Sequence, residues 1–386
     1  MDFELTQEQL AFQQTARDFA AGELAPHAAQ WDVNSTFPLN ALRHAGELGF
    51  CGVYSPESDG GLGLSRLDAA IIFEELAAAD PSTTAYLTIH NMATWMLCTW
   101  GSPSIRERWG HRLTSGQAFA SYCLTESGAG SDAAALKTRA ELSSDGYTIN
   151  GAKAFISGAG ISELLVVMVR TGAAGAQGIS AFAIPADTPG ISYGRKEEKM
   201  GWNSQPTRSV FFENVRVPVD HLLGDLGEGF KIAMRGLDGG RINIATCSIG
   251  AAQGALNAAQ CYAKERKQFN RPLAEFQSIQ FKLADMLTDL VAARQMVRMA
   301  AVRLDAKAPH ATAYCAMAKR FATDIGFQVC NDALQIHGGN GYIREYPLER
   351  LVRDTRVHQI LEGTNEIMRS IIARKFMETT TIGDIR

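Results

Sequence analysis

Apolar residues recur at helical spacing from Thr6 to about residue 116, which predicts an N-terminal helical region. Thr6 and Gln9 have the spacing of a capping box, so a helix should begin there. Residues 55–65, SPESDGGLGLS, contain a proline and several glycines and predict a loop. One face of the first helix should carry residues at i, i+4, i+7 and i+8, namely Phe12, Ala16, Phe19 and Ala20.

The pattern changes between residue 119 and about residue 225, where short runs rich in β-branched residues predict strands. YTIN lies between Asp145-Gly146 and Asn150-Gly151, two dipeptides that are typical of turns. The runs LLVVMVRT, ISAFAIP and SVFFENVRVP follow. We therefore expect a middle antiparallel β-domain, whose predicted core contains Val166, Val167, Val169, Phe211 and Phe212.

Helical period returns after Gly229 and predicts long helices, among them residues 276–307, residues 312–336 and a third segment after Glu362. At 1.5 Å per residue the first of these would extend roughly 45 Å, a length typical of helical bundles. One face of that helix is apolar and contains Ile279, Leu283, Met286, Leu287, Leu290 and Val297.

The predicted fold class is a multidomain α+β protein. We expect an N-terminal all-α domain over residues 1–118, the β-domain over residues 119–226 and a C-terminal four-helix bundle over residues 227–386. No G-x-G-x-x-G segment opens a helix, so a dinucleotide would not bind in Rossmann fashion.

Charge and composition exclude several classes of partner. The 386 residues include 37 basic and 41 acidic side chains, a net charge of −4, which predicts no nucleic-acid partner and no attraction to an anionic membrane. The N-terminus, MDFELTQEQ, is acidic, unlike a targeting peptide, and no apolar run reaches membrane-spanning length. A cytoplasmic location is the expectation.

Cysteine and histidine spacing argues against disulfides and metals. Seven cysteines, an odd number without a C-x-x-C pair, predict buried thiols in a reducing compartment. The eight histidines lack H-x-x-x-H spacing, so we expect no metal site.

The most informative segment is HQILEGTNEIMR, which places Glu362 beside apolar residues. Leu361 precedes this acid, Gly363 allows close approach to the backbone, and Thr364 can cap the helix that follows. A carboxylate held there would be a desolvated base. The alternative is an acid that merely lies near a helix start, where the dipole favours negative charge by about 0.3–1 kcal/mol.

Other segments offer anion-binding groups. The glycines and hydroxyls of CLTESGAGSDAA can expose main-chain N–H groups to an anion or a ring edge, although a surface loop would look the same. Arg241 and Arg266 are candidate anion partners, or else solvated charges. Gly239 and Gly240 lie inside a predicted helix, and each lowers its stability by roughly 1 kcal/mol relative to alanine. We therefore expect that the missing side chains allow the close approach of a ligand or another helix.

Six ordered motifs, LTESGAGSD, FISG, GWNSQPTR, RKQF, QIHGG and LEGTNEIMR, resemble those of the acyl-CoA dehydrogenases over nearly the whole chain. STTAYLTIHN and GGRINIATCS are similar to members that act on short branched acyl groups. The resemblance implies FAD as cofactor, acyl-CoA as substrate, an electron-transferring flavoprotein as partner and a homotetramer. It implies that Glu362 is the catalytic base.

The resemblance also assigns binding residues. The expected FAD contacts are Tyr122, Cys123, Leu124, Thr125, Gly130, Ser131, Phe155, Ile156, Ser157, Arg266, Phe276, Gln277, Gln335, Ile336, His337, Gly338, Gly339, Thr364, Asn365 and Glu366, some of them reaching across a subunit boundary. The expected acyl-CoA contacts are Ser131, Asp238, Gly239, Gly240, Arg241, Gly363 and Arg374.

Two positions depart from the commonest family pattern, because Leu361 replaces a tyrosine and Phe155 a frequent tryptophan. Both keep apolar bulk. Some relatives carry the base on the helix after GLD, but Gly240 stands there and cannot abstract a proton. Alternatives that remain are an acyl-CoA oxidase or flavin monooxygenase on the same fold, and a non-catalytic CoA-binding or scaffold protein.

Overall fold

The computed structural model describes residues 4–378, and Asp2 lies outside this part. The predicted capping box is confirmed, because Thr6 Oγ1 accepts from Gln9 N at 3.1 Å. The loop over residues 55–65 is also confirmed, with one short 3-10 turn. The N-terminal helices are α1 (Gln7–Phe19), a π-helical turn (Ala20–Leu24), α2 (Ala28–Asn34), α3 (Leu39–Glu47), α4 (Arg66–Ala79), α5 (Pro81–Trp100) and α6 (Pro103–Thr114).

The middle region is one predominantly antiparallel sheet in the order β6-β7-β3-β2-β4-β5-β8, with β1 paired to β4. Two pairings, β1 with β4 and β2 with β4, are parallel, which the sequence pattern did not predict. β1 enters from the helical domain without a hairpin, so nothing requires it to run antiparallel to its neighbour. The strands are β1 (Ala120–Cys123), β2 (Arg139–Ser143), β3 (Gly146–Ser157), β4 (Leu164–Arg170), β5 (Ile179–Pro185), β6 (Ile191–Tyr193), β7 (Thr207–Val217) and β8 (Leu222–Leu223).

Two local predictions for this sheet are wrong. Asn150-Gly151 is not a turn, because β3 continues through it and the register against β7 shifts between Ile149 and Gly151. Phe212 lies in the core, but Phe211 is 40% exposed, since successive side chains of a strand point to opposite faces. Val166, Val167 and Val169 are buried as predicted.

Helices form the C-terminal region, as predicted, and three long ones dominate it. The predicted ends of α8 and α9 are accurate to within two residues. α7, α8 and α9 pack on one another, and α12 packs on α9. Met286, Leu290 and Val297 of α8 are buried, but Leu287 is half exposed. The helices are α7 (Gly229–Glu265), α8 (Gln277–Asp305), α9 (Ala311–His337), α10 (Gly339–Tyr342), α11 (Leu348–Arg356) and α12 (Asn365–Glu378).

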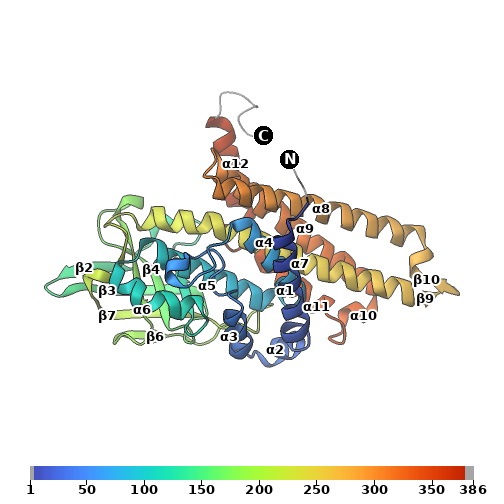
Figure 1. Ribbon diagram of the computed structural model, residues 1–386, viewed down its shortest axis with the longest axis horizontal. Coiled ribbons are helices and arrows are strands. Elements are labelled where there is room, and N and C mark those ends of the chain that lie inside the picture. The colour runs from blue at the N-terminus through green and yellow to red at the C-terminus, as the bar shows by residue number, and fades with distance from the viewer. Residues whose placement is uncertain (1–3, 379–386) are drawn as a thin grey trace.

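α7 connects the parts of the molecule, because it packs against α4 and α5 as well as against α8, α9 and β5. Figure 1 shows the sheet at one end of the molecule and the small β9–β10 ribbon (Lys267–Gln268 and Arg271–Pro272) at the other. The middle of the molecule, where α4, α5 and α7 meet, therefore borders both the sheet and the bundle. In residues 4–378 no helix is long and apolar enough to cross a membrane.

Candidate active site

Glu362 lies in the short connection between a 3-10 turn (Val357–Gln359) and α12. Its φ is 56° and that of Gly363 is 88°, so two consecutive residues adopt the left-handed conformation. For a residue with a side chain this conformation costs of order 1–3 kcal/mol, and it persists where the surroundings fix it. Thr364 caps α12 as predicted, accepting from Ile367 N at 3.2 Å.

The Glu362 carboxylate has the properties of a base. The residue is half-buried, but its Oε2 atom is fully buried and has no hydrogen-bond partner within residues 4–378. Burial raises the pKa of Glu362 from 4.5 to about 7, against the positive charges of Arg241 and Lys319. A carboxylate with a raised pKa and a free oxygen is suited to accept a proton near neutral pH.

Gly240 on α7 faces this carboxylate. A side chain at Gly240 would overlap with the carboxylate oxygens of Glu362, and one at neighbouring Gly239 would overlap with the guanidinium of Arg66. The sequence predicted the close approach of a ligand or another helix at this glycine pair. The groups that approach it are the side chain of Glu362, from the segment before α12, and that of Arg66, from α4. Because α7 has no side chains at these two positions, the carboxylate of Glu362 and the guanidinium of Arg66 can lie against the helix.

Arg66 is a buried residue of the site that the sequence analysis missed. Its guanidinium carbon lies 3.5 Å from the centre of the Tyr54 ring and 4.8 Å from that of Trp95. Its Nη1 atom is buried and has no hydrogen-bond partner among the described residues. The negative charge of Glu362 acts on Tyr54, which places the Arg66 cluster beside the base. An arginine at the start of the largely apolar α4 is the sequence signal that could have identified it.

Asp238 and Arg241, two predicted substrate contacts, bind each other at 2.7 Å. Thr312 also donates to Asp238 Oδ2, at 2.7 Å. Arg241 is buried and its Nε has no hydrogen-bond partner among residues 4–378, while its charge opposes the rise in the pKa of Glu362. This pair therefore places one buried cation next to the base.

The end of β1 and the loop that follows it border the base on another side. The Tyr122 hydroxyl is buried and has no hydrogen-bond partner in the described part of the chain, and its pKa is raised by burial and by the charge of Glu362. The carbonyl of Thr125 accepts from Ala154 N at 2.8 Å, which fixes the loop to β3. Cys123 and Leu124 are buried, whereas Gly130 and Ser131 are exposed.

Phe155, at the end of β3, is 68% exposed and has a left-handed φ of 57°. Gly130 has open space where a side chain would lie. An exposed aromatic ring and an open glycine loop fit a planar, largely apolar cofactor such as the flavin of FAD. Ile156 is buried behind this surface, and Ser157 accepts from Ser121 through its carbonyl at 2.6 Å.

Most of the remaining predicted cofactor residues form a second group near the C-terminal end of α7. Arg266 caps the end of α7 beside the β9–β10 ribbon, which lies far from the sheet in Figure 1. Gly338 and Gly339 have open space at their side-chain positions. His337 is buried and stacks on Tyr262 with the ring centres 4.2 Å apart. Of the others, Phe276 is half-buried, Gln277 and Gln335 are exposed, and Ile336 is buried.

The residues after the base differ in orientation. The Asn365 side chain is buried and bonds to Lys319 and Thr323 of α9. Glu366 and Arg374 are exposed on α12. The structure therefore brings Glu362, Gly240, Arg241 and the loop after β1 together, but it separates them from the group around Arg266.

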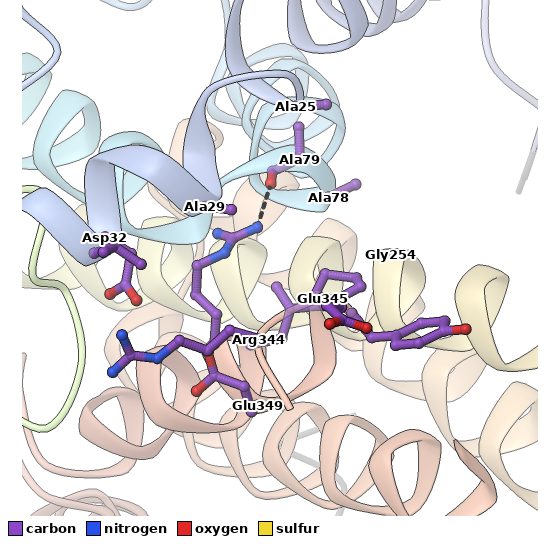
Figure 2. Close-up of a pocket in the computed structure, with 14 residues that line it drawn as sticks. Ala25, Ala29, Asp32, Ala78, Ala79, Gly254, Arg344, Glu345 and Glu349 are labelled. Carbon is purple, nitrogen blue, oxygen red and sulfur yellow. Dashed lines mark hydrogen bonds between the residues drawn. The ribbon is translucent and has the colours of Figure 1, made fainter. Parts of the chain in front are cut away.

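A pocket of about 340 Å³ lies elsewhere, between α4, α7 and the segment before α11. Its lining, shown in Figure 2, mixes acids with arginines, and Arg350 Nη2 donates to the carbonyl of Ala79 at 3.2 Å. Glu362 does not line this pocket. Within residues 4–378 no group of three or more His, Cys, Asp or Glu side chains could hold a metal. Six cysteines are buried, but Cys261, predicted to be buried, is exposed.

Comparisons with known proteins agree along the chain. Family models for the N-terminal, middle and C-terminal domains of acyl-CoA dehydrogenases match residues 6–117, 121–215 and 227–377. The chain is 53% identical to mitochondrial isobutyryl-CoA dehydrogenase of Bos taurus over 97% of its own length and 90% of the relative's.

Two solved structures share the fold. Butyryl-CoA dehydrogenase from Megasphaera elsdenii has a TM-score of 0.95 at 38% identity, with 98% of this chain and 100% of that chain covered. A chain from the structure of the electron transferring flavoprotein of Acidaminococcus fermentans has a TM-score of 0.96 at 39% identity, with the same coverage.

Proposed function

Because the chain belongs to the acyl-CoA dehydrogenase family, we propose that it oxidises a short branched acyl-CoA, isobutyryl-CoA, to methacrylyl-CoA. The family makes the protein a flavin-dependent oxidoreductase. The single observation that carries the proposal is the buried, unpartnered Oε2 of Glu362 facing Gly240.

In this proposal Glu362 removes the proton from the α-carbon of the thioester. Desolvation raises its pKa to about 7 and so makes it a stronger base than an exposed glutamate. By the family resemblance, the main-chain N–H of Glu362 donates to the thioester oxygen, and one such donor is worth about 3–4 kcal/mol. One residue then both removes the proton and stabilises the resulting charge.

We propose FAD as the cofactor, held by the loop after β1 and by Phe155. FAD, when bound, accepts the hydride from the β-carbon of the acyl group. The support is the exposed left-handed Phe155 and the open space beside Gly130. Tyr122 lies close enough to the base for the charge of Glu362 to act on its hydroxyl, so it links this surface to the base.

The branched substrate is proposed from the 53% identity with a relative named isobutyryl-CoA dehydrogenase. The side chain that precedes the base agrees with an apolar acyl group. Leu361 packs with Trp202 and Ile244 in an apolar cluster beside the base. 2-Methylbutyryl-CoA and butyryl-CoA are the alternative substrates.

We propose a homotetramer in which a second copy completes each FAD site. Gly240 lies in the first third of α7 and Arg266 directly follows its last residue, so at 1.5 Å per residue they are roughly 39 Å apart. Arg266 therefore cannot contact a flavin that lies beside Glu362 of its own chain. α8 exposes a stripe of apolar side chains suited to self-association, namely Phe281, Leu287, Val291, Met299 and Val302.

An electron-transferring flavoprotein is the proposed acceptor, supported by the likeness to a chain from a structure of that name. Stoichiometric peroxide formation without an added acceptor would instead favour an oxidase. The cytoplasmic location stays a prediction, and the bovine relative is named as mitochondrial.

Glu362→Gln tests the proposal. We expect FAD content and acyl-CoA binding to stay within a few-fold, while turnover with isobutyryl-CoA and a dye acceptor falls at least ~100-fold. Glu378→Gln, which changes an exposed glutamate on α12, is the matched control. Activity of the Glu362 variant within a few-fold of wild type would reject the base assignment.

The substrate is tested separately with isobutyryl-, 2-methylbutyryl-, isovaleryl- and butyryl-CoA. We expect the highest kcat/KM for isobutyryl-CoA. A clear preference for isovaleryl-CoA would overturn the substrate while leaving the chemistry in place. A purified protein that shows no flavin absorbance after FAD is added would instead favour a non-catalytic role.

A further inference from the structure

Lys319 on α9 is fully buried directly behind the segment that carries the base. Its Nζ donates to the carbonyl of Gly363 at 2.8 Å and to Asn365 Oδ1 at 2.8 Å. A buried ammonium group is costly unless it is bonded, so its position has a specific reason. The two groups that Lys319 binds belong to the residues on either side of Thr364, so its position serves to hold this segment.

The contact with Gly363 acts on the backbone that orients the base. Glu362 and Gly363 are both left-handed, and the bond from Lys319 fixes the carbonyl that follows this pair. Asn365 anchors the other side, because its amide donates to Thr323 Oγ1 at 3.0 Å and to Asp324 Oδ1 at 2.7 Å. α9 therefore holds the segment at two points, Gly363 and Asn365, which are separated only by Thr364.

Lys319 is also coupled to the base by charge. Its positive charge opposes the rise in the pKa of Glu362, and burial lowers its own pKa to about 8. The charged groups that act on Lys319 are Asp324 of the same helix and, from neighbouring elements, Glu362, Arg241 and Glu366. His358 contacts the same region, and its pKa is lowered to about 3, mainly by burial, so it is neutral.

We propose that Lys319 is a positioning residue for the dehydrogenation, which holds Glu362 in its left-handed conformation against Gly240 and supplies a buried positive charge to its carboxylate. This inference rests on the proposed function. Lys319 touches neither substrate nor cofactor in this assignment, and it acts through Glu362.

Lys319→Met, which removes the charge and both donors at similar length, is the main test. We expect at least a 10-fold loss of kcat at pH 7 with KM within a few-fold and FAD content unchanged. Loss of the positive charge destabilises the carboxylate, so the acid limb of the kcat profile should move to higher pH by at least half a unit. Lys319→Arg, which keeps the charge, should restore the limb toward its wild-type position.

Lys282→Met is the matched control, because Lys282 of α8 pairs at 2.6 Å with Asp332 of α9, the helix that carries Lys319, but is partly exposed. It should leave the acid limb unchanged. If Lys319→Met binds no FAD, Lys319→Gln replaces it, since glutamine keeps a donor but not the charge and should still shift the limb.

An unchanged acid limb in the Met or Gln variant would overturn the inference, because a merely structural role lowers the folded fraction without moving that limb. The proposed function fails in a different way. Wild-type protein that shows no bleaching of its flavin by any of the four acyl-CoA thioesters would reject the function itself.

Discussion

At the scale of single residues, the site depends on charges that are buried and incompletely paired. Glu362 Oε2, Arg66 Nη1, Arg241 Nε and the Tyr122 hydroxyl all lack a hydrogen-bond partner within residues 4–378. An unsatisfied buried group costs about 1–3 kcal/mol, so four in one region indicate a site built for a ligand. The first two of these atoms lie against Gly240 and Gly239 of α7, and the charge of Glu362 interacts with both Arg241 and Tyr122.

Arg66, together with Tyr54 and Trp95, lies at one end of the site. We expect Arg66 to limit the length of the acyl chain that the site accepts. Covering its free N–H with methylene groups would cost about 1–3 kcal/mol, which disfavours long straight chains. In Arg66→Met we expect kcat/KM for hexanoyl-CoA to rise at least ~10-fold relative to isobutyryl-CoA. The measurement is a turnover panel of the two thioesters.

Arg106→Met is the control for this change, because Arg106 pairs with Asp59 at 2.7 Å in the same domain without contacting the site. It should leave the ratio of the two substrates unchanged. Equal losses for both thioesters in the Arg66 variant would show that Arg66 supports the fold and does not set chain length.

The sequence pattern identified Glu362 as a candidate site residue, but it did not identify Arg66 or Lys319. Glu362 stands out in the sequence because apolar residues precede it and a glycine follows it. Arg66 does not, because its close approach to Gly239 joins residues that lie far apart in the chain. Lys319 was missed for a different reason, because a lysine within a helix is usually solvent-exposed and nothing nearby in the sequence indicates that this one is buried.

At the scale of elements, the glycines at positions 239 and 240 lower the intrinsic stability of α7 and leave space for the carboxylate of Glu362. Gly240→Ala should raise the intrinsic helix propensity by about 1 kcal/mol, but its methyl group would meet the Glu362 carboxylate. We expect at least a ~10-fold loss of kcat with little loss of thermal stability. The measurement combines turnover with a thermal unfolding curve.

Gly22→Ala provides the comparison, because a side chain at Gly22 would have nothing within 4 Å. It should leave turnover unchanged. Full activity in the Gly240 variant would show that Glu362 does not need its present position against α7.

Hydrophobic period predicted the long helices accurately, because a one-sided apolar face repeats over many turns. It failed at Asn150-Gly151, where a dipeptide typical of turns forms a bulge inside β3. The neighbouring strand β7 supplies the pairing that keeps β3 extended, and that pairing lies about 60 residues away in sequence. Local signals therefore give an element's type better than its interruptions.

At the scale of the whole molecule, one buried network joins all three regions. Arg350 of α11 binds Asp80 at the start of α5 at 3.2 Å, and Asp354 accepts from Trp202 N in the middle region at 2.6 Å. Burial raises the pKa of Asp354 from 3.8 to about 7, against the charge of Arg350. The network therefore couples domain contacts to the protonation of one carboxyl group.

Arg350→Met should destabilise the protein by about 3–5 kcal/mol, because it leaves buried carboxylates without their cation. The folded pKa of Asp354 lies above its unfolded value, so between pH 3.8 and about 7 the folded state binds the extra proton. The stability that this group contributes therefore falls as pH rises through that range. We expect a larger loss at pH 8 than at pH 5.5, measured by denaturant unfolding.

Arg17→Met is the control at this scale, because Arg17 pairs with Glu75 at 2.9 Å on the surface. It should cost less than about 1 kcal/mol. A loss in Arg350→Met that is the same at both pH values would show that Asp354 does not titrate as described.

The order of helices, sheet and helices could be predicted from period alone, but the contacts between these regions could not. The network of Arg350, Asp80 and Trp202 joins residues that no local pattern relates. The separation of the expected cofactor residues into two distant groups likewise follows from the length of α7 and not from any local pattern.

That division has a genetic consequence. If the base comes from one copy and Arg266 from its neighbour, then a chain that lacks Glu362 and a chain that lacks Arg266 carry different, separable defects. Mixed assemblies of the two would contain some sites with neither defect, so two inactive alleles should complement each other when they are expressed together.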